Sequence, residues 1–440
     1  MNKADKRLIL IELNEINFDI VEKYIGSHSG QFPSLKKLLD GHKIRTSAEQ
    51  RYEELEPWIQ WPSVHTAQSF AEHGVFRLGD MVGAKAPQIF EVVEGAGYKV
   101  GAISAMNAEN RLAKPCYFLP DPWTQTPSDG SFWSQSLTEA VSQAVNDNAK
   151  AKITFKSAIQ VALALLRFAK PKHYLLYLKL IAGSRKKPWN KALVLDLLLH
   201  DVHASFFDST RPNFSTLFLN AGAHIQHHYF FNAAPLRKEL TYKNPEWYAN
   251  PNDDPLADVL GLYDMIIGEY LEQSDSELLV ATGLAQKPYD RLKFYYRLNR
   301  HDDFLNSLGI KFTGVYPRMT RDFLIEFSNK NEASMAQTVL SGLKVEGDEL
   351  PLFGEIDNRG SSLFVTLTYP KEITEKTKFI LNEKLFSLKP EVSFVAIKNG
   401  MHQSEGFAFF SKKLSAFAPK DKAHVSHLGR TIADYFEVVI

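Results

Sequence analysis

The sequence predicts an α/β fold built on a mainly parallel, doubly wound sheet with helices on both faces. The chain of 440 residues opens on a wholly apolar run, Leu8 to Ile11, which suits a strand buried on both faces of a parallel sheet. Further β-rich runs end near Gly, Ala or Asn, and helical stretches lie between them. The chain has more residues than one simple hydrophobic core contains, so we also expect insertions.

The elements follow in order along the chain. Asn17 to Ile25 reads as a helix with Asn17 or Asp19 near its cap, and Phe32 to Gly41 as a short helix closed by glycine. Four more strands are expected, at His42 to Glu49, Gly97 to Met106, Ser215 to His224 and Ser276 to Gln286. We therefore assign 1–134, 211–330 and 396–440 to an α/β core, with a helical basic insertion (a cap) at 135–210 and a small α/β insertion at 331–395.

The insertion at 135–210 contains a cationic block. From Lys150 through Lys191 there is no acidic residue, while the Lys and Arg residues are Lys150, Lys152, Lys156, Arg167, Lys170, Lys172, Lys179, Arg185, Lys186, Lys187 and Lys191. The apolar runs ALALLRF and YLLYLKLI lie among these cations. Two interpretations stay open: a solvated cap over the cleft, or peripheral contact of 150–191 with an anionic membrane surface.

Composition narrows the function classes. Lys plus Arg and Asp plus Glu each total 51, which argues against a dedicated nucleic-acid binder. The one cysteine, Cys116, allows no intrachain disulfide and fits a reducing compartment. The first apolar run is interrupted at Glu12, unlike a signal peptide, and no stretch of eighteen uncharged apolar residues follows. We expect a cytoplasmic protein, or one peripheral to the inner face of the membrane.

Two polar clusters lie near the N-terminus. Glu12, Asn14 and Glu15 surround the end of the first strand, where ligands bind in open α/β sheets. A carboxylate there suits a hard metal or a general base, and the alternative is a helix cap with a surface glutamate. The segment 56–66, EPWIQWPSVHT, is expected as a proline-fixed loop. Its hydroxyls could serve as nucleophiles, and the alternative is a rigid aromatic turn.

Three more clusters follow later strands. Asn220 to Tyr229 holds three histidines in five residues, and a helix would place His224 and His228 on one face, either as metal ligands or simply buried. The turns ATGLAQ at 281–286 and NGMHQSEG at 399–406 also come at strand ends. Each of these two is either part of a site or an ordinary surface turn.

The order of these motifs resembles the alkaline phosphatase superfamily, in particular its nucleotide pyrophosphatase/phosphodiesterase branch. LILIELNEINFDIV with FPSLKKLL is similar to the first strand, metal carboxylate and helix of that branch. PWIQWPSVHT with EHGV resembles its nucleophile loop, FLNAGAH its Asp-x-x-x-His motif, LLVATGL its Ser-Asp-His-Gly segment, and GMHQSEGF its late histidine. The resemblance implies an alkaline-phosphatase-like fold and, in the family, two metal ions with a Thr or Ser nucleophile.

The departures from the family are equally informative. The first Asp falls on Asn14 or Glu12, the nucleophile on Gln60, and the Asp-His pair near Thr282 and Gly283. Gln60 cannot be a nucleophile. The resemblance leaves one metal site, made of the residues Asn220, His224 and His402, while the other is largely dismantled. The cofactor is therefore one divalent ion, zinc or manganese, or none.

The resemblance leads to one favoured function and one alternative. We expect a divergent hydrolase or transferase acting on a phosphate ester or nucleotide-linked carbohydrate, in bacterial surface polysaccharide metabolism, on a small-molecule or glycan substrate. The alternative is a pseudo-enzyme that binds a sugar or phosphate. The catalytic candidates are Glu12, Gln60, Ser63, His65 and Thr66. The substrate-binding candidates are Asn14, Trp61, Gln226, Thr282 and Gln286. The sequence predicts no oligomeric state.

Overall fold

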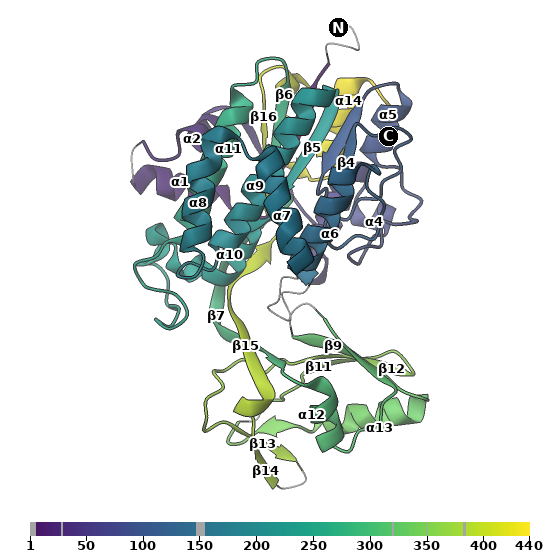
Figure 1. Ribbon diagram of the computed structural model, residues 1–440, viewed down its shortest axis with the longest axis vertical. Helices are drawn as coiled ribbons and strands as arrows, with labels where there is room; N and C mark the ends of the chain where they lie inside the picture. The colour runs from purple at the N-terminus through teal and green to yellow at the C-terminus, as the bar shows by residue number, and fades with distance from the viewer. Residues whose placement is uncertain (1–5, 28–29, 147–154, 319–320, 349, 382–383) are drawn as a thin grey trace. The chain divides into compact units, whose positions relative to one another are not determined.

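A computed structural model describes the chain except for residues 1–5, 28–29, 147–154, 319–320, 349 and 382–383 (Figure 1). The chain folds into two compact units. Among the described residues, unit 1 comprises 6–146, 155–288 and 400–440, and unit 2 comprises 289–399. The paired strands β7 (Ala285–Leu298) and β15 (Val392–Gln403) carry the chain from unit 1 to unit 2 and back. The second unit thus begins before the expected small insertion at 331–395 and contains it.

Unit 1 is built on an eight-stranded sheet. Its strands, in spatial order, are β17 (Ala423–His424), β2 (His42–Ser47), β16 (Glu405–Phe410), β6 (Glu277–Ala281), β1 (Leu8–Leu13), β5 (Phe214–Leu219), β3 (Val100–Ile103) and β4 (Tyr117–Leu119). Neighbouring strands are parallel except that β16 runs antiparallel to both β2 and β6. This confirms the predicted mainly parallel α/β class.

Helices cover both faces of this sheet (Figure 1). Because side chains alternate along a strand, Ile9 and Ile11 of β1 pack into one apolar core and Leu8 and Leu10 into the other. The first core is covered by α1 (Phe18–Ser27), α2 (Pro33–Asp40), α6 (Phe132–Asn146), α7 (Phe155–Phe168), α8 (Tyr174–Gly183), α9 (Asn190–Thr210), α10 (Ala221–Tyr229) and α11 (Pro255–Leu271). The second is covered by α3 (Pro57–Thr66), α5 (Ile89–Gly95) and α14 (His427–Phe436), and α4 (Phe70–His73) follows α3.

The expected basic helical insertion is part of unit 1. It forms α6 to α9, and Leu193 and Leu197 of α9 are buried in the same core as Ile9 and Ile11 of β1. Lys150 and Lys152 of the cationic block lie outside the described residues. None of the helices in the described ranges is both long and apolar enough to cross a bilayer.

Unit 2 is a small α/β unit. It contains the helices α12 (His301–Ser307) and α13 (Lys330–Ser341), a sheet of β11 (Glu355–Asn358), β12 (Ser362–Thr366), β9 (Asp322–Glu326) and β8 (Gly314–Pro317), and a sheet of β10 (Lys344–Val345), β13 (Lys378–Leu381) and β14 (Lys384–Ser387). Phe323 and Leu363, on two of the paired strands, are fully buried.

Residues 57–66 of the segment 56–66 form the helix α3, and the expectation of a loop was wrong. Pro57 occupies the first turn, where its missing N–H costs nothing. Pro62 lies inside the helix and cannot donate to the carbonyl of Trp58, four residues earlier. The side chain of Asn107 replaces that donor, since its Nδ2 lies 2.7 Å from the Trp58 oxygen. A partner distant in sequence thus makes the interior proline tolerable.

Candidate metal centre

Three side chains from separate parts of unit 1 converge on one point. Glu15 follows β1, His227 lies on α10 and His402 lies near the end of β15. Each histidine Nε2 lies 3.1 Å from Glu15 Oε2, and the two Nε2 atoms are 3.3 Å apart. Within the described ranges, this is the one group of three or more carboxylate, histidine or cysteine side chains whose ligand atoms lie within 4.8 Å of one another.

The backbone of Glu15 is held in a strained conformation. Its φ of 62° is left-handed, which costs a non-glycine residue roughly 1–2 kcal/mol. Its N–H donates to the Thr282 carbonyl at 3.0 Å, and its carbonyl accepts from Gln226 Nε2 at 2.8 Å and from the Gln286 N–H at 3.2 Å. Three residues predicted to bind substrate therefore support Glu15. Strain of this kind persists where the surroundings enforce it, typically at functional sites.

The carboxylate of Glu15 is buried but charged. The side chain is 2% exposed, and its oxygens also accept from Asn14 Nδ2 at 3.1 Å and from Gln286 Nε2. Burial raises the pKa of Glu15, but the charges and hydrogen bonds of His402 and His227 outweigh it, so the pKa lies well below its ordinary value. A buried anion of this kind requires a cation next to it, either a protonated imidazole or a metal ion.

The cluster opens to solvent on the His227 side. The side chain of His227 is 33% exposed, while that of His402 is 10% exposed. The Nδ1 atom of His402 lies 3.6 Å from Glu56 Oε2, which is too long for a hydrogen bond but close enough for electrostatic attraction. A carboxylate on the far nitrogen is the usual second-shell partner of a metal-binding histidine.

The three ligand atoms fit one divalent cation. Around tetrahedral zinc with bonds of about 2.0–2.1 Å, neighbouring ligands are about 3.3 Å apart, close to the separations observed here. The described residues contain no second group of this kind. Asn14 Nδ2 donates to Asn220 Oδ1 at 2.8 Å, so two hydrogen-bonded amides occupy positions where the family resemblance implies carboxylates. Thr282 Oγ1 accepts from the Phe407 N–H at 2.9 Å.

The predicted metal ligand His224 lies on α10 but outside the cluster. Its ring packs against His228, with 4.6 Å between ring centroids, and burial, with His227 nearby, lowers the pKa of His224 to about 4. Of the predicted metal set Asn220, His224 and His402, the structure brings only His402 to Glu15. Trp61 Nε1 donates to Asn14 Oδ1 at 2.8 Å, so this predicted substrate residue orients an amide.

The predicted catalytic residues Glu12 and His65 form a buried pair. His65 Nε2 lies 3.1 Å from Glu12 Oε1, which also accepts from Thr216 Oγ1 at 2.5 Å. Both side chains are closed to solvent. Glu12 Oε2 and His65 Nδ1 have no hydrogen-bond partner among the described residues. The pair lies in the second apolar core, between the sheet and α3, and not at the Glu15 cluster.

Three other catalytic candidates, Gln60, Ser63 and Thr66, lie on α3 with their side chains buried. Gln60 Nε2 donates to the Glu54 carbonyl at 2.8 Å, and Thr66 Oγ1 donates to the Pro62 carbonyl at 2.7 Å. All three side chains, including Ser63, are fully buried. The structure thus gives Gln60, Ser63 and Thr66 no open face toward a substrate.

Ser63 contacts a histidine, but the hydrogen bond between them runs in the wrong direction to activate Ser63 as a nucleophile. His73 Nε2 lies 3.0 Å from Ser63 Oγ, and His73 Nδ1 accepts the Val75 N–H at 3.0 Å. Burial lowers the pKa of His73 to about 4, so its ring is neutral and its proton lies on Nε2. His73 therefore donates to Ser63, which itself donates to the Ile59 carbonyl, and cannot act as its base.

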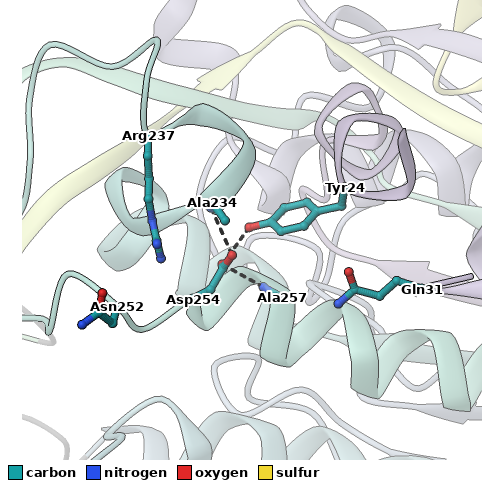
Figure 2. A pocket seen from close by; sticks show the side chains of 7 residues that line it. All are labelled: Tyr24, Gln31, Ala234, Arg237, Asn252, Asp254 and Ala257. Carbon is teal, nitrogen blue, oxygen red and sulfur yellow. Dashed lines mark hydrogen bonds between the residues drawn. The ribbon is translucent and has the colours of Figure 1, made fainter. Parts of the chain in front are cut away.

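A separate hollow of about 420 Å³ lies between α1 and the start of α11 (Figure 2). Its polar groups have structural roles. Asp254 caps α11 by accepting the Ala257 N–H at 3.1 Å, and it also accepts from Tyr24 at 2.7 Å and from the Ala234 N–H at 3.0 Å. Arg237 donates to two backbone carbonyls. None of the residues of the Glu15 cluster lines this hollow.

Sequence reasoning missed Glu15 and His227, although both lay in clusters it had identified. The family motifs directed attention to Glu12, Asn14 and His224 instead. The available signal was local: Glu15 is the second carboxylate after the first strand, and His227 is one of three histidines in five residues. Choosing between neighbours required the actual backbone direction after β1, which the left-handed Glu15 sets.

Comparison with solved structures returns enzymes of the alkaline phosphatase superfamily, the family that the sequence motifs resemble. Phosphonoacetate hydrolase from Sinorhizobium meliloti 1021 is 12% identical with a TM-score of 0.44, covering 98% of this chain and 96% of that chain. Murine ectonucleotide pyrophosphatase/phosphodiesterase 5 is 11% identical with a TM-score of 0.40, covering 99% and 96%. The alkaline phosphatase of the Antarctic bacterium TAB5 is 8% identical with a TM-score of 0.41, covering 99% and 98%.

No protein-family model and no curated protein matches the chain. Likenesses at these identities and TM-scores carry no information about activity.

Proposed function

We propose that the protein is a divergent hydrolase or transferase of phosphate esters that uses one divalent cation held by Glu15, His227 and His402. One observation carries this proposal: three ligand atoms lie 3.1 to 3.3 Å apart, and one of their side chains is open to solvent. Two histidines and one carboxylate form a ligand set of catalytic zinc sites, which keep a further position open. Two imidazoles also favour zinc over manganese, which prefers oxygen ligands.

The residues around the proposed cation site would have distinct roles. Gln226, Gln286 and Asn14 fix the backbone and carboxylate of Glu15 before any ligand arrives, so the site costs little reorganisation. His227 marks the side from which a substrate approaches. When bound, the cation supplies Lewis-acid stabilisation of negative charge on a phosphoryl oxygen.

For the substrate we propose a phosphate ester, and as its narrower form a nucleotide-linked carbohydrate used in surface polysaccharide metabolism. The cation site supports the phosphate part, because phosphoryl oxygens are anionic ligands for such an ion. The carbohydrate part and the bacterial setting rest on the sequence resemblance alone, and the cytoplasmic setting rests on the single cysteine and the interrupted first apolar run.

The experiment is a turnover screen on p-nitrophenyl phosphate and bis(p-nitrophenyl) phosphate, as a monoester and a diester. The protein is stripped with a chelator and reloaded with zinc or manganese. We expect metal-dependent turnover that His227→Ala abolishes and that His224→Ala, a matched change on the same helix, preserves. Turnover unaffected by His227→Ala would exclude the proposed site.

A second function is a binding protein without turnover. The buried, already hydrogen-bonded hydroxyls of Ser63 and Thr66 favour it, because neither is available as a nucleophile. In this case the two imidazoles contact Glu15 directly, with no metal between them. Titration calorimetry with inorganic phosphate and sugar phosphates would then show binding without metal, while the turnover screen stays negative.

A further inference from the structure

The outward sides of α7 and α8 are apolar. Three residues of α7 and three of α8 face solvent at helical spacing: Ile159, Leu163, Leu166, Leu175, Leu178 and Ile181. We call these six residues the apolar face of α7–α8. We propose that this face docks the protein on an anionic membrane surface, with the helices lying in the interface.

The exposure of this face is unusual. Leu166 is 82% exposed, Leu175 81% and Leu178 64%. Single exposed leucines are common on protein surfaces, but three large apolar residues at helical spacing on each of two helices that pack against α9 form apolar stripes of the kind that marks an interaction site. The opposite sides of the helices are buried as expected, through Phe168 of α7 and Tyr177 of α8. Apolar residues therefore occupy both sides of each helix.

The two helices are held firmly in this orientation. Both pack against α9, as the ribbon shows (Figure 1). The connection between them is pinned by His173, whose Nδ1 lies 2.8 Å from Asp201 Oδ1 and whose Nε2 lies 2.8 Å from Glu269 Oε1. Lys170 Nζ adds an ion pair with Glu269 at 2.6 Å. The outward leucines are thus presented by a fixed scaffold.

Cations border the apolar face. Between 155 and 191 the chain has no acidic residue. In the part of the chain that the structure describes, four cations of this stretch pair with acids elsewhere: Lys156, Lys170, Lys172 and Lys187. Five others are exposed and form no ion pair among the described residues: Arg167, Lys179, Arg185, Lys186 and Lys191. Two of these directly follow outward leucines, Leu166 and Leu178.

This combination fits a lipid surface better than a second copy of the chain. Apolar side chains can enter the acyl boundary while the long cationic side chains reach anionic headgroups. A symmetric dimer through the same face would bring the unpaired cations of both copies together, which costs free energy. With 14 and 10 residues, α7 and α8 are shorter than the roughly 20 residues needed to span the hydrocarbon core, so they would lie along it.

The test is flotation of the full-length protein with vesicles of phosphatidylcholine alone and of equal parts phosphatidylcholine and phosphatidylglycerol. We expect binding to the anionic vesicles only, weakened by salt. The double variant Leu175→Glu/Leu178→Glu should weaken binding by roughly tenfold or more. Arg167→Glu/Lys179→Glu tests the cations separately. Met335→Glu, on α13 and 63% exposed, is the matched control and should bind like the unmodified protein.

Several outcomes would overturn the proposal. One is failure to bind anionic vesicles; others are equal binding to neutral vesicles and binding unchanged by the leucine variant. Light scattering after size exclusion covers the remaining case, since a dimer that the leucine variant converts to a monomer would make this face a contact between two copies. Because all substituted residues are exposed, circular dichroism should show that the variants remain folded.

Discussion

The choice of metal ligands can be tested with two histidines of one helix. The structure predicts that His227→Ala loses the bound metal and that His224→Ala retains it, because only His227 points to Glu15 and His402. The sequence motifs predict the opposite for His224. Both residues lie on α10 three positions apart, so the two variants differ little in helix propensity.

The size of the effect follows from the number of ligands. Zinc sites with four protein ligands bind with about 10–16 kcal/mol, or roughly 3 kcal/mol per ligand. Removing one of three ligands at the Glu15 cluster should therefore weaken the affinity by about 100-fold. For comparison, loss of a second-shell partner such as Glu56 should cost about 10- to 100-fold.

The assay is elemental analysis of the purified protein after equilibration with zinc, followed by competition with a chelator of known affinity. Near-stoichiometric metal should appear in the unmodified protein and in His224→Ala, and only traces in His227→Ala. Equal metal in both variants would refute the structural ligand set. Loss in His224→Ala alone would restore the set inferred from the family motifs. Absence of metal from the unmodified protein would remove the basis of the catalytic proposal.

Three further predictions concern buried groups. Hydrogen bonds and charges of Asp201 and Glu269 outweigh the opposing effect of burial and raise the pKa of His173 to about 9 from 6.5. The resulting stabilisation is complete below pH ~6.5 and is lost as the pH rises through 9, so the free energy of unfolding should fall by about 3 kcal/mol over that window. Urea denaturation measures this change, which should be absent in His173→Gln. Asn107→Ala leaves the Trp58 carbonyl without its donor and should lower the unfolding free energy by about 3 kcal/mol, whereas unchanged stability would contradict this role of Asn107. Glu12→Ala leaves the buried His65 and Thr216 without their shared acceptor and should cost roughly 1–3 kcal/mol by the same denaturation while elemental analysis shows the metal retained. Metal loss with normal stability would instead place Glu12 in the site.

Local sequence patterns were sufficient to predict the fold class. A wholly apolar run such as Leu8 to Ile11 can be buried only between two layers, and repeated β-rich runs separated by helices favour a parallel sheet. The first strand, the first two helices and the strands near 42–49 and 97–106 lie where the sequence placed them, whereas the strand expected at 215–224 ends at Leu219 and α10 begins at Ala221. The clusters at 12–15, 220–229 and 399–406 also contain every ligand atom of the Glu15 cluster.

The tertiary structure determines which residue of each sequence cluster joins the Glu15 cluster. Glu12 and Glu15 differ by three residues, yet one points into the core beside His65 and the other turns to the histidines, because the chain takes a left-handed step after β1. That step is enforced by Gln226 and Gln286, which are more than 200 residues away. Likewise, α3 accommodates Pro62 in its interior because Asn107 satisfies the carbonyl that this proline leaves unpaired. Side-chain direction at such points depends on contacts distant in sequence, which local residue patterns do not encode.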